Sequence, residues 1–186
     1  MKKFYFGTMA YYISEEDLDK IKNNTKTLYI STHVYDPQDV LGNLTIANQD
    51  KKKKYYHIAS NNPMTKFCHL YTKFFTNSNV ILIKNNTVQK AVDRLNQNDN
   101  VFIYILPYKS LGNGVYNIHK LTNCKLFFVR IKPMPDTIIH KIKGTSFMFK
   151  SKFKVELEEI ETLPDKDDFK KKLYNFPVDY NIKKYL

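Results

Sequence analysis

The longest uninterrupted apolar runs in this sequence, residues 101–106 and 126–129, are no longer than ordinary β-strands. A membrane-spanning helix needs about 18 to 20 consecutive apolar residues. The sequence therefore excludes a membrane protein and predicts short, buried strands. The charged start at Lys2 and Lys3 precedes only a brief apolar stretch, shorter than the roughly 7 to 15 residues of a signal-peptide core. We expect a cytoplasmic protein without a signal peptide.

The order of strand-like and helix-like segments predicts the fold class. Strand composition or alternation covers residues 4–8, 27–32, 55–59, 80–84, 101–106, 124–131, 138–142, 146–149 and 152–160. Helical spacing covers residues 15–23, 65–75 and 87–96, a short terminal helix follows Asp165, and residues 42–54 are expected to form a loop. Strands outnumber helices, and few segments follow a strand–helix–strand order. This pattern predicts an α+β fold. We expect a split or strongly twisted, largely antiparallel sheet with three or four short helices.

The chain is expected to form a single domain over residues 1–186. The apolar fraction of 42% is sufficient for one core, and no repeat, proline-rich linker or change of composition divides the sequence. Ser14 followed by three acidic residues is typical of a helix N-terminus, and Thr87 is expected to cap the helix at 87–96.

The last predicted strand has a clear alternation of side chains. Phe153, Val155 and Leu157 share one face, whereas Glu156 and Glu158 share the other with a lysine. We expect this strand to form a hairpin with residues 146–149, turning near residues 150–151.

Common catalytic signatures are absent from the sequence. There is no glycine-rich phosphate loop, no nucleophile elbow and no His-Glu-x-x-His motif, and the chain has 5 glycines in all. The cysteines Cys68 and Cys124 lack zinc or redox spacing, so we expect reduced, packed thiols. The five histidines are scattered, and no metal site is expected.

The formal net charge of +12 would ordinarily indicate an anionic partner. Only Arg94 and Arg130 are arginines, however, and the abundance of Lys, Asn, Ile and Tyr is typical of A/T-rich codons. Part of the basic charge is therefore expected to record a biased genome, such as that of a large DNA virus, a phage or a low-GC bacterium. The scarcity of arginine also disfavours base-specific reading of DNA.

One arrangement near the N-terminus resembles a known enzyme superfamily. Phe4-Tyr5-Phe6-Gly7-Thr8, a short helix and then Leu28-Tyr29-Ile30-Ser31-Thr32 occur in the order found at the start of ADP-ribosyltransferases. Glu156-Leu157-Glu158 is similar to the late Glu-x-Glu motif of that superfamily. Phe6 stands where the family has a histidine.

The resemblance implies NAD as a substrate and a protein or nucleic acid as the acceptor of ADP-ribose. By that resemblance, Tyr5, Gly7 and Thr8 would contact the dinucleotide, Tyr29 or Ser31 would contact the nicotinamide ribose, and Glu156 or Glu158 would act on the ribose carbon. These segments are then expected to line one pocket. A buried carboxylate can stabilise the cation that forms when the nicotinamide bond breaks.

Two non-enzymatic hypotheses remain open. The first is a surface that binds nucleic acid, because a cationic run that leads into aromatic residues can neutralise phosphates and stack bases. Its residues are Lys51, Lys52, Lys53, Lys54, Tyr55 and Tyr56. The second is a protein-interaction domain without chemistry, in which Tyr29 and Ser31 alternate with core residues and the late glutamates face solvent. The oligomeric state is not encoded in any pattern we identify.

Overall fold

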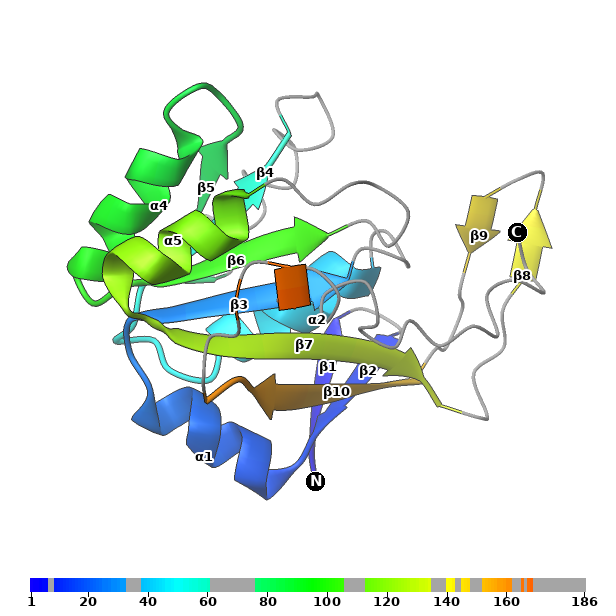
Figure 1. Ribbon diagram of the computed structural model, residues 1–186. Helices are drawn as coiled ribbons and strands as arrows, with labels where there is room; N and C mark the ends of the chain where they lie inside the picture. The colour runs from blue at the N-terminus through cyan, green and yellow to red at the C-terminus, as the bar shows by residue number, and fades with distance from the viewer. Residues whose placement is uncertain are drawn as a thin grey trace.

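An eight-stranded mixed sheet forms the centre of the protein in the computed structural model (Figure 1), which describes residues 1–6, 9–32, 38–60, 76–105, 113–134, 140–142, 145–147, 152–161, 165 and 167–168. The strand order is β1-β2-β10-β7-β3-β6-β4-β5. These strands are β1 (Lys2–Phe6), β2 (Met9–Ile13), β3 (Thr27–Thr32), β4 (Tyr55–Ala59), β5 (Ser78–Leu82), β6 (Asn100–Ile105), β7 (Lys125–Pro133) and β10 (Lys152–Glu159). A separate antiparallel pair consists of β8 (His140–Ile142) and β9 (Thr145–Phe147).

The five strands β7, β3, β6, β4 and β5 are all parallel to one another. Antiparallel pairing in this sheet occurs between β1 and β2 and between β10 and β7. The fold is α+β with a mixed sheet, as the fold class predicted. The expectation of a largely antiparallel sheet is wrong, because five of the seven strand pairings are parallel.

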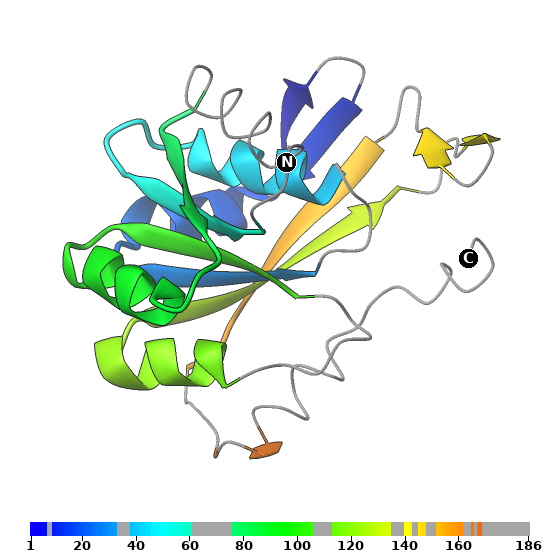
Figure 2. The same cartoon turned by 90° about the horizontal axis from the view of Figure 1, so that it is seen from above.

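Helices cover both faces of the sheet (Figure 2). The helices α1 (Glu15–Asn23) and α2 (Gln38–Ala47) pack on one face, in a cluster that includes Leu18, Ile46 and Tyr29. The helices α4 (Thr87–Asn96) and α5 (Gly114–Thr122) pack on the other face, in a cluster that includes Leu95 and Ile118. Because each face has its own apolar cluster, the central strands are buried on both sides.

The first helix begins where the sequence predicted. The backbone N–H of Asp17 donates to Ser14 Oγ at 3.0 Å, and the three acids of the first turn lie at the positive end of the helix dipole. At α4 the predicted cap is displaced by one residue. Asn86 is the N-cap, and Thr87 instead bonds back to the N–H and carbonyl of Lys84.

Several elements differ from the prediction. Residues 42–54 were expected to be loop, but α2 occupies residues 38–47, and the strand β2 and the helix α5 were not anticipated. The expected hairpin near residues 150–151 is also wrong, because β9 pairs with β8 whereas β10 lies between β2 and β7. The helix expected at 65–75 lies outside the described residues. No described helix is long and apolar enough to cross a membrane.

Candidate functional site

The residues suggested by the transferase resemblance lie on two different faces of the sheet. Ser31 of β3 pairs with Val129 of β7, which pairs with Leu157 of β10, so these three side chains share one face. Glu156 and Glu158 flank Leu157 and therefore point to the opposite face. The expectation that they line one pocket with Tyr29 or Ser31 is corrected by this register.

Tyr29 and Ser31 are core residues with no exposed surface. The Tyr29 ring stacks on Phe102 at a centroid distance of 4.7 Å and on Phe127 at 5.8 Å. Burial raises the pKa of Tyr29 well above its ordinary value, so its hydroxyl stays neutral. Tyr29 therefore contributes to the packing of the core, and its side chain exposes no surface to a ligand.

Glu156 and Glu158 belong to a network of ion pairs across β10 and β7. Glu156 lies 3.1 Å from Lys132 Nζ and 2.8 Å from Lys154 Nζ, and Glu158 contacts Arg130. Partial burial acts to raise the pKa of Glu156, but hydrogen bonds from Lys154 and Lys132 outweigh it and leave the pKa lowered. Both glutamates have cationic partners, as side chains of an ordinary charged strand face do.

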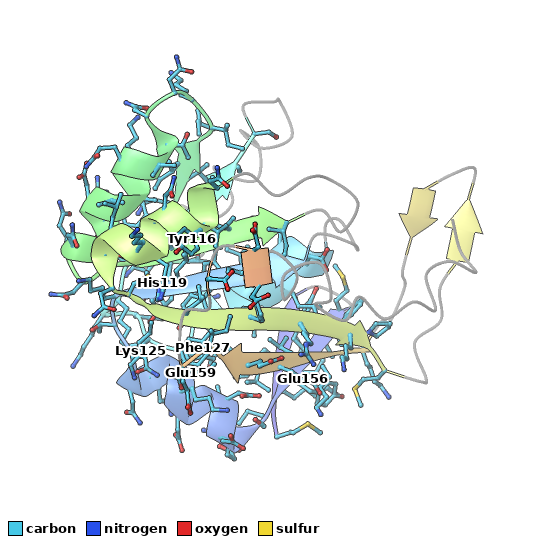
Figure 3. All side chains as sticks on the ribbon, viewed as in Figure 1. Tyr116, His119, Lys125, Phe127, Glu156 and Glu159 are labelled. Atoms are coloured by element: carbon cyan, nitrogen blue, oxygen red, sulfur yellow. The ribbon has the colours of Figure 1, made fainter. Side chains whose placement is uncertain are left out.

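A cleft of about 580 Å³ lies beside these glutamates, between the start of α1 and β10. It forms where β2 stops pairing with β10 at Val155, so the second half of β10 faces the helix. Figure 3 shows Glu156 and Glu159 at separate positions along β10. Five acids against three bases make the cleft unsuited to an anionic dinucleotide. Its lining residues are Ser14, Glu16, Asp17, Lys20, Arg130, Lys154, Glu156, Leu157, Glu158 and Glu159.

The expected dinucleotide contacts at the N-terminus are only partly described. Tyr5 on β1 is 64% exposed, with the Lys3 ammonium 4.7 Å from its ring centroid. Register places Tyr5 beside Ala10 and Lys152, on the same face as the late glutamates. Gly7 and Thr8 lie outside the described residues.

The predicted nucleic-acid surface at Lys51–Lys54 is interrupted by structural contacts. Lys53 Nζ donates to two backbone carbonyls at the end of α1, that of Ile21 at 2.8 Å and that of Lys22. Burial lowers the pKa of Lys53. Tyr55 is fully buried and Tyr56 is 8% exposed. This corrects the expectation that the two tyrosines form a stacking surface, whereas Lys51, Lys52 and Lys54 are exposed.

A different location carries the topological feature that α/β proteins use for ligands. The neighbouring parallel strands β3 and β6 lead to helices on opposite faces, β3 to α2 and β6 to α5. We call the carboxyl ends of these two strands, at Ser31 and Tyr104, the switch point. In open sheets with parallel strands, ligands bind outside the carboxyl ends at such a point.

Both helices follow strands that end at the switch point. Asn43 in the middle of α2 donates from Nδ2 to Ser31 Oγ at 2.8 Å, which holds α2 beside the end of β3. The helix α5 ends two residues before β7 begins, so its last turn lies at the amino edge of the sheet and Gly114 faces the carboxyl edge. Asn113, the N-cap of α5, makes no side-chain capping bond.

Buried polar side chains line the sheet face near the switch point. His57 of β4 is 4% exposed, and its Nδ1 lies 2.7 Å from Tyr104 Oη. Burial lowers the pKa of His57 to about 3, so the ring is neutral at physiological pH. Within the described residues, His57 Nε2 and Asn43 Oδ1 have no hydrogen-bond partner. Buried polar atoms without partners are uncommon, and a bound water, ion or ligand is one explanation for them.

Sequence analysis did not identify these residues as a site. Asn43 fell in a segment interpreted as loop, and His57 was one of five scattered histidines. The available signal was local: polar residues at the carboxyl ends of apolar strands, which become neighbours only when those strands are known to be parallel.

No group of three or more His, Cys, Asp or Glu side chains in the described part of the chain is arranged to hold a metal ion. Because this finding covers only the described residues, the expected absence of a metal cofactor stays a prediction. No protein-family model matches the chain, and no curated protein sequence matches it.

Proposed function

We propose that this protein binds the ADP-ribose part of NAD, or a free nucleoside diphosphate, at the switch point. The main observation behind this proposal is that β3 and β6 end at this point and are followed by helices on opposite faces of the sheet. NAD is the substrate that the N-terminal resemblance implied. The topology supports that ligand at a different place from the one the motifs suggested.

A diphosphate is the group that this arrangement favours. The N-terminus of a helix carries a partial positive charge and free backbone N–H groups, both of which attract phosphate oxygens. At α5 no capping bond from Asn113 competes for those amides. The net charge of +12 adds a general attraction for an anionic ligand.

Polar side chains beside the switch point can recognise the sugar and base. Asn43 and Tyr104 offer an amide and a hydroxyl, which suit ribose hydroxyls or the ring nitrogens of a base. His57 is neutral, so it can hold the Tyr104 hydroxyl in one direction without adding charge.

The catalytic part of the transferase hypothesis needs a carboxylate near the ligand. Glu156 and Glu158 face the other side of the sheet, so they are poorly placed for a ligand at the switch point. Asp39, in the first turn of α2, is a buried carboxylate on the correct face and is the better candidate if transfer occurs. We therefore propose nucleotide binding as the primary function.

The test compares two substitutions at equivalent helix caps. Asn113 and Asn86 are both N-caps that make no side-chain capping bond. They differ in position, because α5 follows β6 at the switch point whereas α4 follows the edge strand β5. Asn113→Asp places a carboxylate where the diphosphate is expected and should weaken ADP-ribose binding about tenfold, or roughly 1.4 kcal/mol. Asn86→Asp is the matched control and should bind like the wild type, as should Glu156→Gln.

Binding is measured by titration calorimetry and by thermal unfolding with ADP-ribose, NAD, ADP and ribose. Ligand at a hundred times its dissociation constant should stabilise the fold by about 2.7 kcal/mol. Lack of stabilisation by both ADP-ribose and NAD would refute the proposal. Equal weakening by Asn113→Asp and Asn86→Asp would place the ligand elsewhere.

A further inference from the structure

The part of the sheet made of β1, β2, β10 and the second half of β7 has a face that the described helices leave open. The apolar cluster under α4 and α5 takes members from β3 to β7 but none from β1, β2 or β10. In Figure 1 these two helices lie over the other half of the sheet. We define the open face by six residues that register places on it: Lys3, Tyr5, Tyr12, Lys132, Lys152 and Lys154.

Lysines and tyrosines form adjacent rows on the open face. Strand pairing aligns Lys3 with Tyr12, Tyr12 with Lys154, and Lys154 with Lys132, which makes one row across four strands, about 14 Å long. Tyr5 and Lys152, both paired with Ala10, lie in the next row. The Lys3 ammonium lies 4.7 Å from the Tyr5 ring centroid and 5.5 Å from that of Tyr12.

The formal charge of the described side chains on this face is positive, because five basic residues stand against the two carboxylates Glu156 and Glu158. The basic residues are Lys3, Arg130, Lys132, Lys152 and Lys154. Glu156 lies between Lys132 and Lys154, and Glu158 contacts Arg130. Hydrogen bonds with Tyr5 and then Tyr12 raise the pKa of Lys3, so its ammonium is charged throughout the physiological range.

We infer that the open face binds single-stranded nucleic acid. Lysines along a groove or face neutralise the phosphate backbone, and exposed aromatic rings stack unpaired bases without regard to sequence. Tyr5 is 64% exposed and sits among the lysines, which is the combination this mode requires. The inference is independent of the nucleotide proposal, since it concerns another part of the sheet.

Other partners fit the open face less well. Lysine is depleted in protein–protein interfaces, where aromatic residues and arginine are preferred. Duplex DNA keeps its bases stacked inside the helix, so an exposed tyrosine gains little from it. Base-specific reading relies most often on arginine, and the arginine near this face, Arg130, contacts Glu158.

The experiment measures fluorescence anisotropy of oligothymidylate and oligouridylate of about twelve nucleotides, a length within the usual site sizes. The Lys3→Ala/Lys152→Ala variant removes two charges from the open face. Lys51→Ala/Lys52→Ala is the matched control, because it removes two exposed lysines from the run that the sequence first suggested. Salt dependence is recorded for each protein.

We expect the open-face variant to lower the slope of log K against log salt by about 1.4, or about 0.7 for each lost phosphate contact. The control variant should keep the wild-type slope. Tyr5→Ala should weaken single-strand binding at least about fivefold and leave duplex binding unchanged. Saturating ADP-ribose should not displace the oligonucleotide.

Four results would each overturn the inference. They are no binding by the wild type at low salt, an equal loss of slope in the control variant, unchanged single-strand affinity in Tyr5→Ala, and displacement of the oligonucleotide by ADP-ribose. Thermal unfolding of every variant checks that the fold is retained. If ADP-ribose fails to bind while the oligonucleotide binds as expected, the nucleotide proposal fails and this inference stands.

Discussion

At the scale of single residues, His57 makes the core sensitive to acid. Burial lowers its pKa to about 3, whereas in the unfolded chain the pKa of His57 is near the ordinary histidine value of 6.5. Above pH 6.5 the imidazole is neutral in both states and has no effect on stability. As the pH falls below 6.5, His57 binds a proton in the unfolded state but stays neutral in the folded state. The free energy of unfolding should then fall by about 1.4 kcal/mol per pH unit from this residue.

Comparison with His57→Gln isolates this effect, because glutamine keeps a hydrogen-bonding group beside Tyr104 but does not titrate. Urea unfolding of both proteins between pH 7 and pH 4 gives the difference in stability at each pH. That difference should shift steadily in favour of the variant as the pH falls. Burial also lowers the pKa of His119, so the variant should retain part of the wild-type acid sensitivity. A constant difference across this range would contradict the burial argument.

At the scale of elements, α2 depends on a glycine that lets it approach the sheet closely. A Cβ atom at Gly42 would lie 2.5 Å from Ile131 Cδ1 and 3.2 Å from Tyr11 Cε1. Alanine favours a helix by about 1 kcal/mol over glycine, but overpacking typically costs 1 to 3 kcal/mol. Because Ile131 is itself 4% exposed, we expect Gly42→Ala to destabilise the fold in chemical denaturation.

A second substitution tests whether the contact with Ile131 is the cause. Ile131→Val removes the clashing Cδ1 atom, and alone it should cost about 0.5 to 1.5 kcal/mol. In the Gly42→Ala background, the same change should restore stability or leave it unaltered. Additive losses in the double variant would show that the strain lies elsewhere in α2.

The elements that the sequence predicted well are those with strong local signals. Thr27–Thr32 and Tyr55–Ala59 were predicted with the observed bounds, because each is a compact β-forming run. The helix α2 was missed because Gly42 and the neighbouring polar residues resemble a loop. Its side chains Asn43 and Leu44 are buried in the folded protein, and Asn43 bonds to Ser31 of β3. Tertiary packing therefore decided this helix, and local propensity did not.

At the scale of the whole molecule, strand pairing is the property that the sequence did not reveal. The alternation of Phe153, Val155 and Leu157 correctly predicted which residues of β10 face the core. It contained no information on the neighbours of β10, which are β2 and β7. Sequence analysis did not identify the candidate site for the same reason. Ser31 and Tyr104 are 73 positions apart in the sequence and become neighbours only through the parallel pairing of β3 with β6.

The sheet order also predicts how local stability is distributed. The strands β3 and β6 lie in the interior of the sheet and are covered by apolar clusters on both faces, whereas β1 and β5 form its edges. Amide hydrogen exchange should be slowest in β3 and β6, approaching the global free energy of unfolding, and fastest in β1 and β5. Exchange in β1 as slow as that in β3 would indicate that the edge is covered.

The position of β10 between β2 and β7 has a consequence for synthesis on the ribosome. The N-terminal pair β1–β2 joins the rest of the sheet through β10, which is about 140 residues later in the sequence. At the usual 5 to 20 residues per second, that pair emerges on the order of ten seconds before its partner strand. During that interval Tyr11 and Ile13 lack the β10 side of their core. Chaperones that bind nascent chains should therefore recognise the N-terminal hairpin until the last strand arrives.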